Sequence, residues 1–231
     1  MKNDITHKKR QNGEGSSYTR DLEDSSNSTP IADAGGPYTG DEGSPIIFDG
    51  SASYDPDGGT LEYRWDFDGD GIWDTSWSSQ PTATYTFEDN CLCTVRLEVR
   101  DNNGATDTSD TTVTVNNVPS IVGEISLSND RVLVNTEIVA SANFTDPGIL
   151  DTHTAEWDWG DSTTSPGEVI EVSGSGSVSG SHIYTKCGKY IITLKVTDKD
   201  GGVGTSTYKY VIIYSQKRGI SLEKFYIQEI L

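Results

Sequence analysis

The feature that most constrains the fold of this chain is an internal repeat. Residues 48–71, FDGSASYDPDGGTLEYRWDFDGDG, align with residues 139–162, VASANFTDPGILDTHTAEWDWGDS, and residues 84–115 align with residues 181–213. The same motifs recur in the same order about 90 to 97 residues apart, among them an Asp-Pro turn, a Trp-Asp-aromatic segment and an Asp/Gly turn. Since solenoid repeats are much shorter, this period predicts two complete domains in tandem.

Each copy has the pattern of an all-β sandwich with about seven short strands. Hydrophobic residues make up only 33% of the chain and glycines number 24, which favours strands and turns over helices. The strands expected in the first copy span residues 32–38, 45–49, 61–67, 72–77, 82–87, 93–100 and 107–116.

Alternation within the expected strands indicates which residues form the core. In LEYRWDF it places Leu61, Tyr63, Trp65 and Phe67 on one face and Glu62, Arg64 and Asp66 on the other. In the second copy it places Trp157 and Trp159 inward and Asp158 outward. A tryptophan packed between two sheets is typical of an immunoglobulin-like fold.

The repeat predicts four parts: a disordered lead-in (1–30), a first domain (31–118), a second domain (119–215) and a short tail (216–231). Because Pro119 stiffens a short linker, the two domains are expected to stack end to end as a rod. The segment SGSGSVSG at 173–180 has the composition of a flexible loop.

These motifs together resemble the PKD (polycystic kidney disease) repeat. The resemblance rests on the Asp-Pro turns, on WDFDGDG and WDWGDS, and on the strands TVRLEVRDNNG and IITLKVTDKDGG, which occur in order twice. It implies two tandem PKD-type sandwiches, similar to those of archaeal and bacterial cell-surface proteins. The family mostly serves as extracellular spacer, adhesion or accessory modules, so fold is implied more strongly than function.

The charge is strongly acidic and unevenly distributed. The net charge is -19, and residues 31–118 hold 17 acidic and 3 basic residues. Such a surface repels phosphate backbones, which argues against a nucleic-acid partner, and suits divalent cations. Ca²⁺ is therefore the candidate cofactor, and solubility in a salty medium is the other use of this charge.

One candidate calcium site is the segment WDFDGDGIWD. Asp66, Asp68, Asp70 and Asp74 follow the D-x-D-x-D-G spacing that wraps oxygen ligands around one ion. Position 12 is Trp77, where an EF-hand has glutamate, and no helices flank the loop. The alternative interpretation is a solvated acidic turn that blunts a sheet edge.

A second candidate lies where the chain enters each sandwich. Topology gathers Asp55, Asp57, Asp101 and Asn102 there in the first domain, a set that resembles the calcium position of some PKD repeats. The second domain gathers Asp146, Asp151, Asp198 and Asp200. These face the exit end of the first domain, with Asp41, Glu42, Asp68 and Asp70, and would repel one another unless a cation joined them. The hypothesis is that calcium stiffens the rod.

Cysteines, glycosylation sequons and membrane segments add weaker constraints. Cys91, Cys93 and Cys187 are expected to be free or buried thiols, since a bridge between residues two apart on one strand would be strained. Asn27 and Asn143 begin N-x-S/T triplets that accept glycans if the chain is exported. No apolar run is long enough to span a membrane, and the first thirty residues lack the apolar core of a signal peptide.

Catalysis is not expected from this pattern. His7, His153 and His182 are not at metal-ligand spacing, and neither HExxH nor GxSxG occurs. Trp73 and Trp77 are candidates for binding a glycan or protein partner, and the alternative interpretation is that they cover the lower end of the core. The favoured function is a non-catalytic extracellular spacer or adhesion module, with a cell-surface protein or polysaccharide as partner, in a fragment of a longer exported protein. The alternative is an accessory glycan- or protein-binding domain of a secreted hydrolase.

Overall fold

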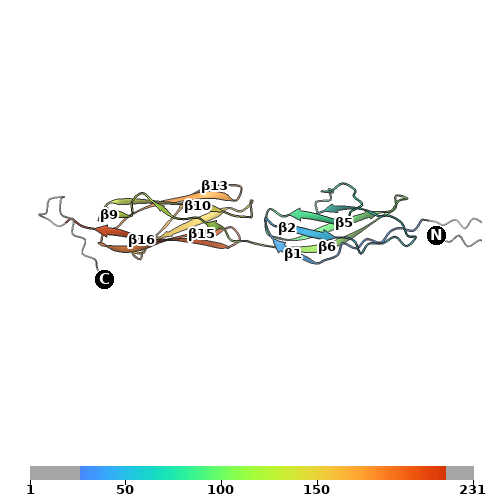
Figure 1. The fold of residues 1–231 in the computed structure, drawn as a ribbon, viewed down its shortest axis with the longest axis horizontal. Helices are drawn as coiled ribbons and strands as arrows, with labels where there is room; N and C mark the ends of the chain where they lie inside the picture. Colours follow the sequence, from blue (N-terminus) through green and yellow to red (C-terminus); the bar gives the residue numbers. More distant parts are fainter. Residues whose placement is uncertain (1–26, 217–231) are drawn as a thin grey trace, which may run out of the picture.

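The computed structural model describes residues 27–216 and shows two β-sandwiches that lie end to end (Figure 1). This confirms the all-β, tandem immunoglobulin-like fold class. The first sandwich pairs a four-stranded sheet, in the order β1-β6-β5-β3, with the two-stranded sheet β2-β4. Its strands are β1 (Tyr38–Asp41), β2 (Pro45–Asp49), β3 (Glu62–Asp66), β4 (Thr82–Thr86), β5 (Cys91–Arg100) and β6 (Thr106–Asn116).

The second sandwich has two five-stranded sheets. One runs β13-β14-β10-β7, with β8 also paired to β10, and the other runs β12-β11-β15-β16-β9. The strands are β7 (Ile121–Val122), β8 (Ser126–Leu127), β9 (Arg131–Leu133), β10 (Glu137–Thr145), β11 (His153–Asp158), β12 (Thr164–Pro166), β13 (Glu168–Val172), β14 (Ser175–Ile183), β15 (Gly188–Asp198) and β16 (Val203–Tyr214). Within residues 27–216 the fold contains no helix that could cross a bilayer.

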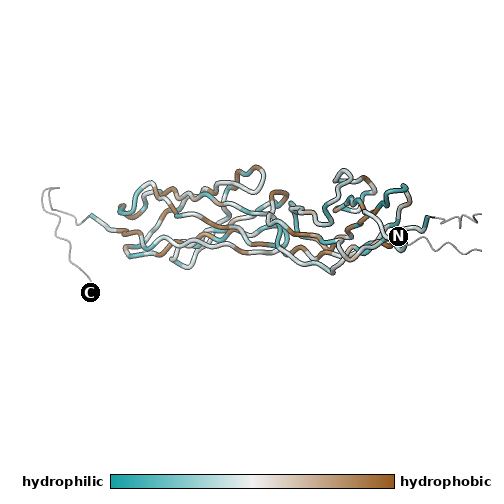
Figure 2. Tube along the Cα trace, turned by 45° about the vertical axis from the view of Figure 1, so that its right-hand side comes forward, coloured by the Kyte–Doolittle hydropathy of each residue, from teal (hydrophilic) through white to brown (hydrophobic). Residues whose placement is uncertain are grey.

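Each sandwich has its own core around the expected tryptophan. Trp65 of β3 is 1% exposed and its ring centroid lies 5.8 Å from that of Phe48 on β2, in the opposite sheet. In the second domain Trp157 and Trp159 are fully buried and stack with centroids 5.5 Å apart. Hydrophobic segments recur along both domains (Figure 2), because one residue in two on each strand faces inward. The inward faces of both copies are therefore confirmed.

Two expected strands of the first domain do not form. The first sheet strand starts only at Tyr38, because Gly35 and Gly36 adopt positive φ angles of 66° and 83° that interrupt an extended backbone. It then pairs in parallel with β6. Residues 72–77 fold back on β3 as a loop, in which Asp74 and Thr75 donate their backbone N–H groups to the Trp65 carbonyl.

The Gly/Ser segment at 173–180 was wrongly expected to be a loop. It forms most of β14, after a tight turn at Ser173 and Gly174. A Cβ built on Gly176 would lie 2.5 Å from the Phe144 ring, and one on Gly180 would lie 2.6 Å from the Trp157 ring. The glycines are therefore present because large aromatic residues of the core press against the strand.

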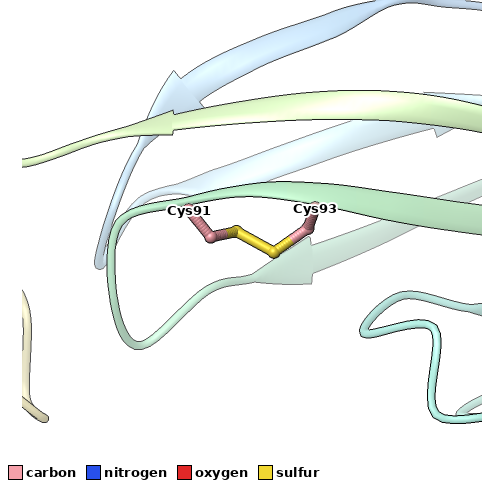
Figure 3. The surroundings of a disulfide bond; sticks show 2 residues. All are labelled: Cys91 and Cys93. Atoms are coloured by element: carbon pink, nitrogen blue, oxygen red, sulfur yellow. A yellow bond between two sulfur atoms is a disulfide. The ribbon is translucent and has the colours of Figure 1, made fainter.

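The expectation of free thiols was wrong for two of the three cysteines. Cys91 and Cys93 form a disulfide along β5 (Figure 3), while Cys187 is free and exposed. The Cα atoms of Cys91 and Cys93 lie 5.5 Å apart, within the usual range for a disulfide. Residues two apart share a face of the strand, and this brings both sulfur atoms to the same side.

The predicted disordered lead-in (1–30) and tail (216–231) lie almost entirely outside the described residues. His7 also lies outside them. The boundary between residues 118 and 119 stays a prediction. In the structure β6 ends at Asn116 and β7 begins at Ile121, so the connection between the two sandwiches is short.

Candidate functional site

Three groups of carboxylates converge closely enough to share one ion in the part of the chain that the structure describes. They are Glu42, Asp146 and Asp151, here called the junction cluster; Asp66, Asp68 and Asp70 in the acidic loop, residues 66–74; and Asp89, Asp151 and Asp200, here called the lysine cluster. In each group the ligand atoms all lie within 4.8 Å of one another. The three groups differ in which hydrogen-bond donors or positively charged side chains already contact their carboxylate oxygens.

The acidic loop uses its carboxylates to hold its own backbone. Asp66 was expected to face outward but is 2% exposed, because the loop folds over it: its two oxygens accept from Gly69 N at 2.7 Å and Gly71 N at 3.0 Å. Asp68 accepts from Asp70 N at 3.1 Å. Asp74 accepts from Phe67 N at 2.7 Å and does not join the other three. The loop is a self-supporting turn with exposed oxygens on Asp68 and Asp70.

At the N-terminal end of the first domain, the predicted ligands Asp55, Asp57, Asp101 and Asn102 contact different neighbours. The Asn27 amide donates to Asp101 at 2.6 Å, and this bond lowers the pKa of the buried Asp101 carboxyl. Ser28 donates its backbone N–H to Asp57 Oδ2 at 2.5 Å. Asp55 Oδ2 and Asn102 Oδ1 both flank Gly59. Among residues 27–216, Asp55, Asp57 and Asp101 do not form one of the converging groups.

The two sequons also differ in their surroundings. The Asn27 amide nitrogen, to which a glycan would attach, is the group that donates to Asp101. Asn143 is exposed on the outer face of β10. Glycosylation therefore stays a prediction for both, with Asn143 the more accessible acceptor.

Glu42 lies in the turn between β1 and β2 and is 0% exposed. Its Oε1 accepts from the backbone N–H of Val118, in the connection between the domains, at 2.7 Å. Its Oε2 is buried and has no hydrogen-bond partner among the described residues. Burial raises the pKa of Glu42, and the nearby Asp151 and Asp146 carboxylates add to this shift.

Asp146 and Asp151 approach Glu42 from the loop between β10 and β11. Asp146 is well satisfied, since it accepts from Ser120 Oγ at 2.7 Å, from Gly148 N at 2.9 Å and contacts His153 Nε2 at 3.0 Å. Asp151 Oδ2 is buried and lacks a partner within residues 27–216. Burial raises the pKa of the Asp151 carboxyl despite its ion pair with Lys199.

The lysine cluster already holds a cation. The Lys199 ammonium contacts Asp151 Oδ1, Asp89 Oδ1 at 2.6 Å and Asp200 Oδ2 at 2.7 Å. Burial opposes its charge, but hydrogen bonds to Asp151, Asp200 and Asp89 raise the pKa of Lys199. Asp198 is separate: it accepts from the Asn117 amide at 3.2 Å and from Gly202 N at 2.8 Å.

Trp73 and Trp77 are not part of either core. Both are half-buried on the outer face of the β3–β5 sheet. The Arg64 guanidinium lies 4.4 Å from the Trp73 ring centroid and 4.5 Å from that of Trp77, and Arg100 lies 4.3 Å from Trp77. They form a cation–π stack on the surface.

A family model described as PKD domain matches residues 27–115 and again residues 124–213. The chain belongs to the PKD domain family. PKD domains are non-catalytic accessory modules, so the two sandwiches are modules of this kind.

Known proteins that contain such modules include a peptidase. The chain is 32% identical over 206 residues to collagenase ColQ1 of Bacillus cereus (strain Q1), a match over 79% of this chain that spans only 20% of the collagenase. Among solved structures, the PKD domain of an M14-like peptidase from Thermoplasmatales archaeon SCGC AB-540-F20 is 26% identical, covering 42% of this chain and 98% of that one, with a TM-score of 0.35. A carbohydrate-binding module of the β-sandwich superfamily is 15% identical, covering 77% and 99%, with a TM-score of 0.37.

The sequence predicts Glu42 at the exit end of the first PKD domain together with Asp41, Asp68 and Asp70, among the carboxylates that a cation would join to those of the second domain. Only Glu42 of these four residues joins carboxylates of the second PKD domain in a converging group, and Asp151 belongs to both the junction cluster and the lysine cluster. One sequence signal could have singled out Glu42. The second domain has Gly148 where the first has Asp57, so a carboxylate from outside the second domain is needed at this position.

Proposed function

We propose that this PKD pair is an accessory module of a larger secreted hydrolase, most specifically a peptidase. The observation that carries the proposal is the 32% identity to part of a collagenase, which extends across both PKD domains. The Cys91–Cys93 disulfide supports export, because disulfides persist in oxidising compartments. This reverses the preference from the sequence, which favoured a cell-surface spacer.

The geometry suits a rod that holds a catalytic unit near an immobilised substrate. Two sandwiches in line separate what is attached at their ends, and each has its own core. A shallow hollow of about 380 Å³ on the second domain is lined by Glu156 and Lys195 among small residues, which is no cleft for paired catalytic carboxylates. Hydrolysis is therefore assigned to a domain outside these two modules.

The surface that would contact substrate is the cation–π stack formed by two tryptophans and two arginines: Trp73, Trp77, Arg64 and Arg100. Ion pairs hold both guanidinium groups in place, since Arg64 contacts Glu98 and Arg100 contacts Glu62 at 2.6 Å. Held aromatic and arginine side chains cost little conformational entropy on binding, which is why such residues dominate binding energy at interfaces. Insoluble protein is the proposed partner, and polysaccharide is the second candidate because aromatic rings also stack on sugars.

Co-sedimentation tests this proposal. The chain is mixed with insoluble collagen and, in parallel, with cellulose and chitin, and bound protein is measured after centrifugation. Trp73→Ala with Trp77→Ala is expected to weaken binding about tenfold or more, as for paired hot-spot residues. Tyr54→Ala, at an aromatic residue that is 55% exposed elsewhere on the first domain, is the matched control.

The outcomes separate the alternatives. Binding to insoluble collagen supports the role as an accessory module of a peptidase. Binding to cellulose or chitin alone would make polysaccharide, instead of protein, the proposed partner. A folded chain that binds none of these supports the spacer or adhesion function instead. Reading the coding sequence on either side of this chain gives an independent test, since the proposal requires a hydrolase domain in the same polypeptide.

We also propose Ca²⁺ as the ion of these modules, because the converging ligands are all carboxylate oxygens and hard oxygen ligands select hard cations. The acidic loop is the weaker candidate, since Asp66 already accepts two backbone hydrogen bonds. The junction cluster is the stronger one.

A further inference from the structure

The strand β4 of the first PKD domain has one side that pairs with nothing else in residues 27–216. Its sheet consists of β2 and β4 alone. Across this sheet the Gly50 N–H donates to the Pro81 carbonyl at 3.0 Å. Hydrogen-bonded pairs alternate along an antiparallel ladder, so every second residue of β4 directs its backbone N–H and C=O groups away from β2. From the register of the two strands, these residues are Thr82, Thr84 and Thr86.

The strands β2 and β3 of the same domain have protected edges. On β2, Pro45 has no N–H to offer a neighbour, and the Asp49 N–H donates to the Tyr38 hydroxyl at 2.9 Å. On β3, the backbone groups of Tyr63 and Ser78 exchange two hydrogen bonds, at 2.8 and 3.0 Å. Native proteins protect sheet edges in such ways because an open edge pairs readily with another strand. The edge of β4 lacks this protection.

Charges, the other common protection of an edge, are also missing from β4. Residues 75–87, TSWSSQPTATYTF, contain no charged side chain, although residues 31–118 hold 17 acidic and 3 basic residues. The threonine side chains of β4 are exposed, and Ile47 of β2, which is 65% exposed, lies opposite Thr84 on the same face. A second copy of this chain, repelled elsewhere by a net charge of -19, meets least repulsion here.

We propose that β4 pairs with β4 of a second copy of this chain, antiparallel and about a two-fold axis that passes through Thr84. In this register Thr84 lies opposite the partner's Thr84, and Thr82 lies opposite the partner's Thr86. The outward backbone groups of both strands then receive partners, because they belong to these same residues on each copy. The two small sheets become one continuous sheet, as the self-complementary interface of a two-fold dimer requires.

Antiparallel pairing fits the elongated shape of the molecule. The strands run along the line that joins the two sandwiches (Figure 1), so the two copies lie side by side and point in opposite directions. The second PKD domain of one copy therefore lies away from that of the other. The tryptophans Trp73 and Trp77 are on the opposite sheet of the first domain and stay exposed in the dimer. The pairing does not depend on the accessory role proposed above.

Sedimentation equilibrium of the full chain at concentrations up to about 1 mM tests the proposal, in about 0.5 M NaCl to screen the repulsion between copies. Wild type is expected to dimerise with a Kd of about 10–300 µM. This weak affinity follows from the length of β4, since two strands of five residues form an interface below the standard size.

Two substitutions of Thr84 test the register. Thr84→Lys places like charges directly opposite each other at the two-fold axis. Thr84→Pro removes an N–H that faces the partner and leaves the ladder with β2 intact. Each is expected to weaken dimerisation about tenfold or more, while circular dichroism shows a folded chain. Thr112→Lys, at an exposed threonine of the interior strand β6, is the matched control and is expected to change Kd by less than about twofold.

Amide hydrogen exchange measured by NMR identifies what pairs with β4. Exchange at Thr84 is expected to slow as the protein concentration rises through Kd, because the dimer forms by mass action. Protection that is already complete far below Kd would show that another segment of the same chain occupies the edge, and would overturn the proposal. A wild-type chain that stays monomeric at about 1 mM, or a dimer that neither Thr84 variant weakens, would overturn it as well.

Discussion

In the first domain the carboxylate after the Asp-Pro turn belongs to the domain itself, Asp57, whereas in the second domain the corresponding carboxylate is borrowed from a neighbour, Glu42. A second difference lies in the turn after β5 and β15. The first domain has Asn102 where the second has Lys199, and Lys199 reaches across the junction to Asp89. Both changes turn a self-contained end into one that requires a preceding domain. The two copies of one fold thus differ at the end where one docks onto the other.

The independence of the two cores gives the largest expected effects. Trp65→Ala and Trp157→Ala each remove a buried indole, so each is expected to destabilise its own domain by about 3–5 kcal/mol. Calorimetry should show one unfolding transition shifted and the other nearly unchanged. If either variant shifts both transitions equally, the two domains form one cooperative unit and the comparison between them fails.

Restoring the first domain's arrangement in the second gives the next largest effect. Gly148→Asp alone inserts a side chain against Glu42 and is expected to cost about 1–3 kcal/mol through overpacking and repulsion. Adding Glu42→Ala removes the conflict, so the double variant should recover much of the loss. Urea unfolding of all four chains forms a double-mutant cycle. Additive costs would show that Glu42 and Gly148 do not share one space.

Replacing Lys199 by the residue of the first domain tests the second difference. Lys199→Asn removes the partly exposed contact with Asp89 and also the ion pair with the buried Asp151, so it is expected to cost about 1–3 kcal/mol without calcium. It also removes a positive charge beside Asp151, so calcium affinity should rise. Calcium titration by calorimetry checks this, with the exposed Lys186→Asn as control. Weaker calcium binding in the Lys199 variant would contradict the expectation.

The smallest effect concerns the aromatic edge of each core. The first domain stacks Phe67 on Tyr85, whereas the second stacks Trp159 on His182, which contacts Asp161 at 2.9 Å. Burial alone would raise the pKa of Asp161, but hydrogen bonds from Thr163 and His182 lower it below its ordinary value of 3.8.

A carboxyl whose pKa is lowered by folding stabilises the protein above its unfolded-state pKa and loses that contribution as the pH falls through the folded-state pKa. Asp161→Asn is therefore expected to cost about 0.5–1 kcal/mol at pH 7 and progressively less below about pH 4. Chemical denaturation at several pH values measures this, and Asp130→Asn, at an exposed residue, is the control. A cost that does not decrease with acid would show that the Asp161 charge is not what matters.

The fold could be predicted from sequence because its signals are local. Alternation in LEYRWDF and EWDWG predicts Trp65, Trp157 and Trp159 as core residues, and all three are buried. Errors arose where distant residues override local composition. The Gly/Ser segment forms β14 because Phe144 and Trp157 press on it, and Asp66 is buried because its own loop folds back over it.

By itself, the sequence determined that this protein forms two sandwiches with acidic ends, since strand periodicity and turn chemistry act between residues close along the chain. Only the tertiary structure decided which acidic residues converge. Glu42 meets Asp151 more than a hundred positions away because a short linker brings the two domains end to end and Gly148 leaves room between them. No local pattern encodes that meeting, because it depends on the relative position of two separately folded units.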